Sequence, residues 1–296
     1  MERSGLPALS PPARSAADSA IPLSSCVNAP RDPEAMLTPV TVTFGIYNQS
    51  APWTDRKEFN WCDLAALLTT HKAGPKEGSC IVPAVFRGAR RHKADADQID
   101  VAFLDSDSGA TLEEIAAAIR AHGWAAVVSS THSHMVSRTT VKRKAWQRFA
   151  CGEPGKEAAF LVQEKGFKEP VAANARIVGE AADSVTFEHQ PCPRFRVAIP
   201  LLRPWRAAEY DNQTIANAVW KERIEALAGA LSLDHDQACT DTSRLFYLPR
   251  TPPGGSAPET LVIDGGPCDL FGLPRRRPSP SARGPRRPAA RGMAGR

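Results

Sequence analysis

The stretch Val101-Ala-Phe-Leu-Asp105-Ser-Asp107 is an apolar run that ends in two carboxylates one residue apart. In an extended strand, side chains two positions apart lie on the same face, so Asp105 and Asp107 are expected to project together. Two like charges this close repel each other unless a cation holds them, and Mg²⁺ and Mn²⁺ prefer carboxylate oxygens. An Asp-x-Asp pair also occurs in turns and helix caps, so the pair alone leaves a structural role open.

The residues after this stretch predict a strand, helix, strand unit. Thr111-Leu-Glu-Glu114 has the spacing of a capping box that opens a helix, and Gly123 ends that helix. The apolar run Trp124–Ser129 follows as a second strand. The two carboxylates therefore lie at the C-terminal end of the first strand, where open α/β sheets bind ligands. The predicted core stripe of the helix consists of Ile115, Ala118 and Ile119.

Polar side chains also follow the second strand. A period of two places Ser130, His132 and His134 on one face. The two histidines resemble half of a zinc site, but no third ligand with a recognisable spacing follows, and the seven cysteines form no C-x-x-C pair. Hydrogen bonds from two strand-end histidines to the backbone explain the pattern as well.

Two further clusters lie downstream. In the segment 194–200, Arg194 and Arg196 alternate with apolar residues, and two guanidinium groups on one strand face suit bidentate contacts to phosphate. A solvated face of an antiparallel sheet is the alternative explanation. The segment 233–249 adds an acidic pair, Asp234 and Asp236, and the basic residue Arg244 before a strand that ends in proline.

Taken in order, these clusters resemble the motifs of the archaeo-eukaryotic primase superfamily, the primase-polymerases, and most closely the branch carried by phages, plasmids and other mobile elements. Asp105 and Asp107 match its Asp-x-Asp motif. Ser130-Thr-His132 fits its Ser-x-His motif literally, whereas His134 resembles the histidine of the "T-x-S-H" form, which we prefer slightly. Asp236, eight positions before Arg244, fits the third motif better than Asp234 does. The resemblance covers roughly residues 42 to 250 and includes the strand 194–204.

The resemblance implies template-directed nucleotidyl transfer by a two-metal mechanism in the replication of a mobile element. Asp105, Asp107 and Asp236 would be the catalytic residues and would hold two Mg²⁺ or Mn²⁺ ions. Loss of Asp105 is expected to abolish synthesis without unfolding the chain. The implied partners are a single-stranded DNA template, nucleoside triphosphates and a replicative helicase acting in trans. Nucleotide binding would fall to Ser130, His132 or His134, Arg194, Arg196 and Arg244.

Three other classes of protein share part of this pattern. A nucleotide-sugar glycosyltransferase uses Asp-x-Asp with Mn²⁺ but does not call for the spacing of Asp236 and Arg244. A rolling-circle initiator endonuclease uses His-x-His with a tyrosine, here Tyr210 or Tyr247, although its middle residue is normally hydrophobic and here is Ser133. A replication protein that binds single-stranded DNA without catalysis is the non-enzymatic alternative.

The sequence predicts an α/β (α+β) fold. A mixed sheet would carry all metal ligands on one face, and the resemblance implies that this sheet is an RNA-recognition-motif-like catalytic core with an N-terminal α/β module. A first strand at 41–45, a helix at 61–68 and an amphipathic helix at 212–231 are expected. The 61–68 helix would pack through Leu64, Leu67 and Leu68, and the later one through Ile215, Val219 and Leu227.

The catalytic domain is expected to span residues 39–250, with 135–190 as an insertion. The start of that insertion is basic and aromatic, which suits contact with a single-stranded template or, equally, a solvated helix face. Residues 251–273 are expected to be a linker. Residues 1–38, rich in Pro, Ser and Ala, and 274–296, with eight arginines and no carboxylate, are expected to be disordered. The basic and aromatic residues are Arg138, Lys142, Arg143, Lys144, Trp146 and Arg148.

Charge and cysteine usage bear on location and partners. The net charge of +5 becomes −3 without the eight tail arginines, so the basic character belongs to the tail, which suits non-specific contact with nucleic acid or has no function. No run of about 18 apolar residues predicts a membrane span, and residues 16–22 lack the apolar core of a signal peptide. Unpatterned cysteines are typical of the reducing cytoplasm, where we expect this protein.

Overall fold

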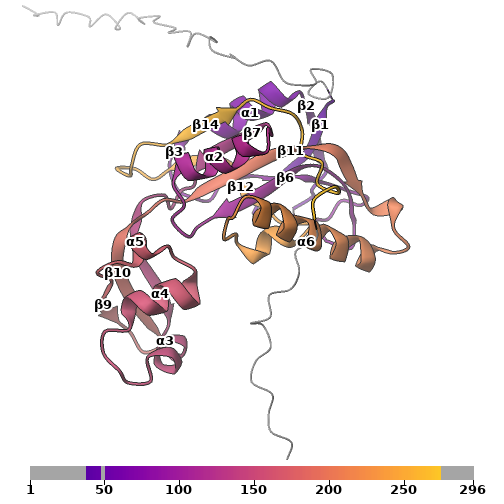
Figure 1. Cartoon of the computed structure of the whole chain (residues 1–296). Coiled ribbons are helices and arrows are strands. Elements are labelled where there is room, and N and C mark those ends of the chain that lie inside the picture. The colour runs from indigo at the N-terminus through magenta and orange to yellow at the C-terminus, as the bar shows by residue number, and fades with distance from the viewer. Residues whose placement is uncertain (1–37, 48–50, 275–296) are drawn as a thin grey trace, which may run out of the picture.

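A computed structural model describes residues 38–47 and 51–274. The chain forms a central five-stranded sheet, an N-terminal four-stranded sheet and a separate lobe that contains a third sheet (Figure 1). Helices and strands both contribute substantially, which confirms the predicted α/β class. The predicted disordered segments, apart from residues 38 and 274, lie outside the described residues. No helix in the described ranges has the length and apolarity needed to cross a membrane.

The central sheet is antiparallel throughout. In spatial order it consists of β14 (Thr260–Ile263), β7 (Ala126–Ser130), β11 (Phe195–Arg206), β6 (Ala96–Ser106) and β5 (Ala84–Phe86). The expectation of a mixed sheet needs correction: β6 and β7 run the same way, but β11 lies between them and is antiparallel to both. At one end of the strands, the start of β11 therefore lies between the C-terminal ends of β6 and β7.

The predicted strand, helix, strand unit is present as β6, α2 (Leu112–Ala121) and β7. Both bonds of the capping box form, because the Thr111 side chain accepts from the Glu114 N–H and the Glu114 carboxylate accepts from the Thr111 N–H. The stretch 99–106 of β6 is fully buried, which explains why its apolar run is continuous instead of alternating. Asp105 thus ends a strand that is rigidly held.

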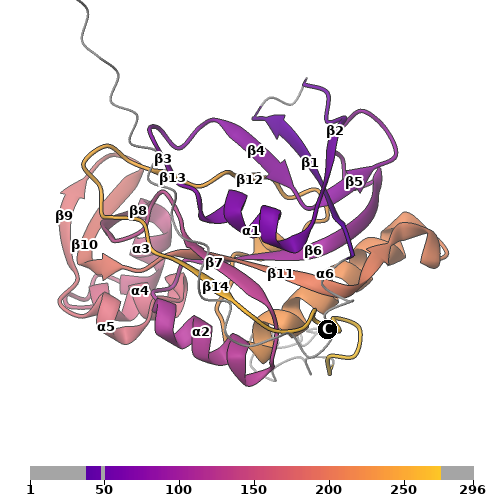
Figure 2. The ribbon, with the colours of Figure 1, turned by 90° about the horizontal axis from the view of Figure 1, so that it is seen from above.

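A second helix, α6 (Gln213–Ala230), lies on the same side of the central sheet as α2, whereas α1 (Trp61–Thr69) and the N-terminal sheet lie on the other side (Figure 2). Asn212 caps α6 through a bond from the Ile215 N–H. The expected stripe is wrong at Ile215, whose side chain is 42% exposed. The face that packs on the core instead contains Ala216, Trp220, Ile224 and Leu227, spaced four, four and three residues apart.

The order β6, α2, β7, β11, α6 follows the first five elements of a β-α-β-β-α-β arrangement. The place of a sixth strand, beside β6, is taken by β5, which comes from earlier in the chain. After α6 and a short 3₁₀ helix, η3 (Gln237–Thr240), the chain instead returns to the N-terminal sheet.

The N-terminal sheet has the order β12 (Phe246–Tyr247), β4 (Ser79–Val82), β1 (Val40–Ile46) and β2 (Asp55–Phe59). Beside it, β3 (Lys72–Ala73) pairs in parallel with β13 (Arg250–Thr251). Segments about 170 residues apart in the sequence are thus joined, and residues 246–251 complete the N-terminal module. The helix α1 covers β7 through buried Trp61, Leu64 and Leu68, with Leu67 partly buried.

Residues 251–273, expected to be a linker, belong to the folded domain. Within them β14 forms an edge strand of the central sheet, paired with β7. Farther on, Cys268 donates its N–H to the carbonyl of Pro200, and both Cys268 and Leu270 are fully buried. Four residues of strand carry too little pattern to be distinguished from a loop in the sequence alone.

The lobe corresponds closely to the predicted insertion. It contains a sheet of order β8 (Val136–Lys142), β10 (Ser184–Cys192), β9 (Arg176–Glu180) and the helices α3 (Arg143–Ala150), α4 (Glu157–Lys165) and α5 (Glu169–Ala172). It has its own apolar core. Trp146 packs edge-on against Phe160 and Phe187 at 5.4 and 5.1 Å between ring centroids. Trp146 therefore packs against the core of the lobe and is partly buried there.

Candidate active site

A pocket of about 220 Å³ opens beside the C-terminal ends of β6 and β7 and the start of β11. It contains all three predicted carboxylates, two of the three predicted arginines and one of the two predicted histidines. It also contains residues from the N-terminal module, so it lies between the two sheets. Its polar lining residues are Lys76, Asp105, Asp107, Ser129, Ser130, Thr131, His132, Ser133, Arg196, Asp236, Arg244, Tyr247 and Arg250.

Asp105 is held in a buried ion pair with Arg196. The two residues face each other across β6 and β11, and Arg196 donates from Nε and Nη2 to the two carboxylate oxygens at 2.7 and 3.1 Å. The third donor of Arg196, Nη1, binds the carbonyl of Tyr247 at 2.7 Å, and the guanidinium lies 4.6 Å from the ring centroid of Phe246. Burial lowers the pKa of Arg196, but the charge and hydrogen bonds of Asp105 outweigh burial, so the pKa is raised. This pair is charged and geometrically fixed.

Asp236 comes from the loop before η3 and lies beside Asp105. Its N–H donates to the carbonyl of Asp105 at 3.1 Å, which joins the loop to the end of β6. One carboxylate oxygen caps η3 by accepting from the Ala238 N–H at 2.9 Å, and the other accepts from Arg244 at 2.8 Å. Asp234, the alternative in the third motif, is exposed and lies outside the pocket lining.

Asp107 differs from the other two carboxylates because no arginine pairs with it in the described structure. It follows β6, borders the pocket and is exposed to solvent on one side. Desolvation by the surrounding chain raises the pKa of Asp107, and the negative charges of Asp105 and Asp236 raise it further, against the charge of Arg194. Three carboxylates are thus near enough to repel one another.

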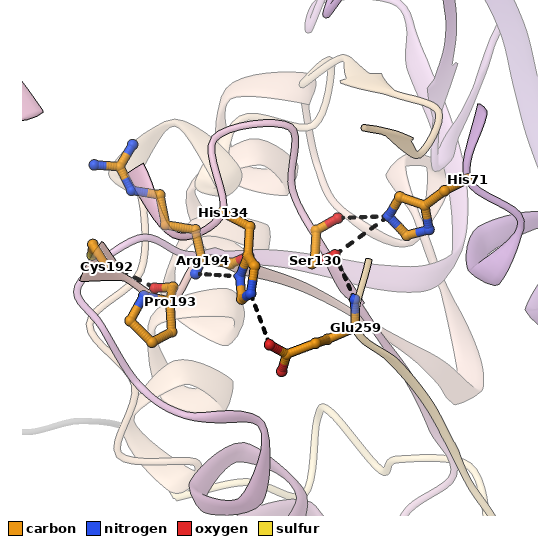
Figure 3. Close-up of polar contacts among 7 residues, drawn as sticks. All are labelled: His71, Ser130, His134, Cys192, Pro193, Arg194 and Glu259. Carbon is orange, nitrogen blue, oxygen red and sulfur yellow. Dashed lines mark hydrogen bonds and ion pairs between the residues drawn. The ribbon is translucent and has the colours of Figure 1, made fainter. Parts of the chain in front are cut away.

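The two histidines of the Ser-x-His region point to different places. His132 lines the pocket, and its Nε2 contacts the carbonyl of Gly74 at 3.2 Å. His134 is buried outside the pocket lining, between Arg194 and Glu259 (Figure 3). The structure therefore places His132, and not the slightly preferred His134, where a ligand of this pocket would be. The two imidazoles do not share the common partner that a His-x-His metal site requires.

Both ring nitrogens of His134 are engaged. Nδ1 lies 3.1 Å from the backbone nitrogen of Arg194 and 3.2 Å from the carbonyl oxygen of the same residue, and Nε2 lies 3.1 Å from the Glu259 carboxylate. Ser130 joins the same network, since its hydroxyl accepts from the N–H of Glu259 at 3.0 Å while Nε2 of His71 contacts its carbonyl at 3.0 Å. This network fixes the ends of β7, β11 and β14 together.

Arg194 is the predicted arginine that does not line the pocket. Its guanidinium points away from His134 (Figure 3) and lies near Cys192. Its charge still reaches Asp107, whose pKa it lowers. Arg194 thus acts on Asp107 through its charge, and its side chain does not line the pocket.

Several polar lining residues were not assigned a role from the sequence. Lys76 and Arg250 come from beside the β3–β13 pair and add two cations. An added Cβ at Gly78 would lie 2.5 Å from the Arg250 guanidinium, so this glycine makes room for it. Ser129 and Thr131 have buried hydroxyls without a hydrogen-bond partner in the described part of the chain. Such atoms suit a pocket that takes a polar ligand.

The donor set fits a divalent cation only in part. Carboxylate oxygens are the ligands that Mg²⁺ and Mn²⁺ prefer, and three carboxylates share the pocket. Within residues 38–47 and 51–274, however, no three His, Cys, Asp or Glu side chains converge closely enough to hold a metal ion by themselves. Mg²⁺ is often bound by one or two carboxylates together with substrate phosphates, and the lining supports that mode.

No protein-family model and no curated protein matches the sequence. Among solved structures, the fold is similar to the AEP domain of the primase-polymerase (PrimPol) of cyanophage S-2L, with a TM-score of 0.32 and 12% sequence identity over 78% of this chain and 86% of that chain.

Proposed function

We propose that this chain is a metal-dependent nucleotidyltransferase that extends a nucleic-acid strand on a single-stranded DNA template. The observation that carries the proposal is the composition of the pocket. Three carboxylates and the four basic residues Lys76, Arg196, Arg244 and Arg250 line a single cavity at the strand ends. A nucleoside triphosphate with its divalent cation presents the complementary charges.

The basic residues are suited to the triphosphate. Lys76 and Arg250 form no ion pair within the described ranges, and they reach the pocket from the N-terminal module. Arg244 donates from Nη2 to Asp236, and its buried Nε has no hydrogen-bond partner in the described structure. His132 and the hydroxyls of Ser129 and Thr131 supply further hydrogen-bonding groups.

Asp105, Asp107 and Asp236 would hold the metal ions together with phosphate oxygens of the substrate. A bound Mg²⁺ or Mn²⁺ would lower the pKa of the attacking 3′-hydroxyl and neutralise charge on the leaving pyrophosphate. Arg196 and Arg244 orient two of the carboxylates at the pocket, whereas Asp107 is unpaired and is the one most available to a cation. The sequence resemblance supports, further, a role in replicating a mobile element with a helicase in trans.

A second function is favoured by one observation. Asp105 and Asp236 are already neutralised by arginines, and no three-residue metal group forms within the described residues. A protein that only binds single-stranded DNA would keep such ion pairs permanently. The two functions predict different effects of removing the Asp107 charge. Catalysis requires this carboxylate, whereas DNA binding alone is weakened by it, because an unpaired negative charge repels phosphate unless a cation is bound.

The test is synthesis on single-stranded DNA with Mg²⁺ or Mn²⁺ and labelled ribo- or deoxynucleotides, with and without an annealed primer. Template-dependent product lost in Asp107→Asn supports the proposal, and product without primer would extend it to priming. Absence of product in the wild-type protein, with DNA binding intact or improved in Asp107→Asn, would establish the binding function instead.

A further inference from the structure

Two tyrosines from opposite ends of the domain lie together, and one of them, Tyr247, lines the pocket. The rings of Tyr47 and Tyr247 are 6.2 Å apart between centroids with an interplanar angle of 45°. The sheet sets this proximity, because Gly45 of β1 and Tyr247 of β12 both pair with Cys80 of β4. The register of the N-terminal sheet therefore brings the two tyrosines near each other.

The two rings differ in exposure. Tyr47 follows the end of β1, and the residue is 67% exposed, the most exposed large hydrophobic residue in the described ranges. Tyr247 is half-buried and lines the pocket. An aromatic ring costs free energy when it is left in water, and its flat face is suited to stacking. Together the rings form an aromatic surface that leads from solvent into the pocket.

This aromatic surface is connected to Asp105 through hydrogen bonds of Arg196. The carbonyl of Tyr247 accepts from Nη1 of Arg196, and the same guanidinium holds Asp105. The adjacent residue, Phe246, lies beneath the guanidinium of Arg196 at 4.6 Å. A ring that stacked on Tyr247 would therefore be placed in a defined position relative to Asp105.

The chemistry around the rings identifies the occupant. Lys76, Arg244 and Arg250 share the pocket with Tyr247, so a ligand there meets cations and an aromatic face together. A ligand that carries phosphates and a flat ring within one small molecule or one repeating unit satisfies both. Bases stack on aromatic side chains with little dependence on sequence, because every base has a π-face.

We propose that Tyr47 and Tyr247 form a stacking site for a nucleobase at the mouth of the pocket. This inference rests on the proposed function and deepens it, since it assigns the base of a nucleotide to the tyrosines and its phosphates to the basic residues. The base belongs either to the incoming nucleotide or to the nucleic-acid strand. The experiment below distinguishes the two sources.

The test measures binding to the full-length chain, without catalysis, for four probes. The first pair is dATP and inorganic tripolyphosphate, and the second is a thymidine oligonucleotide and its abasic counterpart of equal length. The probes within a pair differ only in the presence of bases or of the nucleoside. Titration calorimetry or fluorescence anisotropy gives the dissociation constant of each probe for the wild-type protein and for each variant.

Tyr47→Ala is the informative variant, because its exposed side chain can be removed with little effect on folding. We expect it to weaken binding of the base-containing probe about 5- to 50-fold and to leave the base-free probe unchanged. Tyr47→Phe keeps the ring and should bind as the wild type does. Ile46→Ala is the matched control: Ile46 is 56% exposed, and neighbouring strand residues point to opposite faces.

Each outcome has a definite meaning. Loss for dATP alone supports the site and assigns it to the incoming nucleotide, and loss for the oligonucleotide alone supports it and assigns it to the strand. If the wild-type protein binds the base-containing and base-free probes equally, or if Tyr47→Ala weakens both probes of a pair to the same extent, the stacking site is refuted while nucleotidyl transfer stands. If the wild-type protein binds none of the probes, both proposals fail.

Discussion

Asp105 and Asp107 are two positions apart in the sequence, but the fold gives them different surroundings. Asp105 is buried and fully engaged by Arg196, whereas Asp107 is exposed on one side and has no cationic partner in the described structure. The sequence showed that the two carboxylates are close. It did not show which of them is available to a ligand, because that depends on a strand ninety residues away.

This difference changes the expected effect of substitution. The sequence analysis expects loss of Asp105 to leave folding intact, but Asp105→Ala would leave Arg196 charged and nearly buried without its partner. Breaking one side of a buried ion pair costs about 3–5 kcal/mol, and the 18% exposure of the Arg196 side chain places the cost at about 2–3 kcal/mol. Urea unfolding of Asp105→Ala measures this loss; an unchanged midpoint would show that the pair contributes nothing to stability.

His132 and His134 provide a second test at this scale. His132→Ala removes a pocket side chain that makes one contact, so activity should fall about 10-fold or more while the melting temperature barely changes. His134→Ala removes a buried ring that bonds Glu259 and Arg194, so it should cost about 1–3 kcal/mol of stability. Kinetic constants and melting curves of both variants show which histidine affects activity and which affects stability. The reverse assignment of the two effects would place the nucleotide against His134.

At the scale of elements, the lobe is joined to the loop that carries Asp107. In this loop Ser108 accepts from the N–H of Lys168 at 2.9 Å, and the Lys168 ammonium binds Glu114 of α2 at 2.6 Å. Gly109 has a φ of +98°, and a Cβ there would lie 2.4 Å from Cγ2 of Val171 in α5. The lobe therefore contacts the rest of the domain at Ser108 and Gly109, directly after Asp107.

A substitution at Gly109 should reveal this coupling. Gly109→Ala adds a Cβ in a left-handed conformation against Val171, and the resulting displacement of the Asp107 loop should lower activity about 10- to 100-fold. Gly123→Ala is the matched control, since Gly123 also has a positive φ of +68° but nothing within 4 Å of the added atom. Adding Val171→Ala should recover part of the activity. Equal effects of the two glycine variants on turnover would mean that backbone strain alone, and not the lobe, is responsible.

The lobe also contains a group that makes stability depend on pH. Burial lowers the pKa of His189 below its ordinary value of 6.5, and the charge of Arg194 lowers it further, against the bond to the Gln190 carbonyl. Below pH 6.5 the unfolded chain then binds more protons than the folded one, so the stabilisation is complete above this pH and is lost as pH falls through and below it. Urea unfolding from pH ~8 to ~5.5 should show this decline, reduced in His189→Gln. A decline of equal size in the variant would assign the effect to other groups.

The elements that the sequence predicts well are those with a local signal. The helix α2 has a capping box and a clear apolar stripe, and β6 has a long apolar run. The helix α6 was expected in the right place, and Leu227 of its predicted stripe is buried. The stripe was wrong at Ile215, which is exposed beside the buried Ala216. Short strands such as β13 and β14 gave no signal, since they exist only through pairing with distant segments.

At the scale of the whole molecule, the candidate site is assembled from three regions of the chain. The central sheet provides Asp105, Asp107 and Arg196, the loop after α6 provides Asp236 and Arg244, and the N-terminal module provides Lys76 and Tyr247. The carboxylates and the two arginines were predicted because they fall in short patterns. Lys76, Arg250 and the tyrosine pair were not, because only the return of the chain to the N-terminal sheet brings residues 246–251 to the pocket.

Synthesis by the Asp107→Asn variant is the measurement that tests the central claim most directly. Asp107 has no ion pair to lose, so the variant should fold with the wild-type melting temperature, and a loss of activity cannot be ascribed to unfolding. We expect template-dependent nucleotide incorporation with Mg²⁺ or Mn²⁺ in the wild-type protein and a reduction of at least about 100-fold in the variant. Incorporation at the wild-type rate by a well-folded Asp107→Asn protein would contradict the assignment of this pocket as a metal-dependent active site.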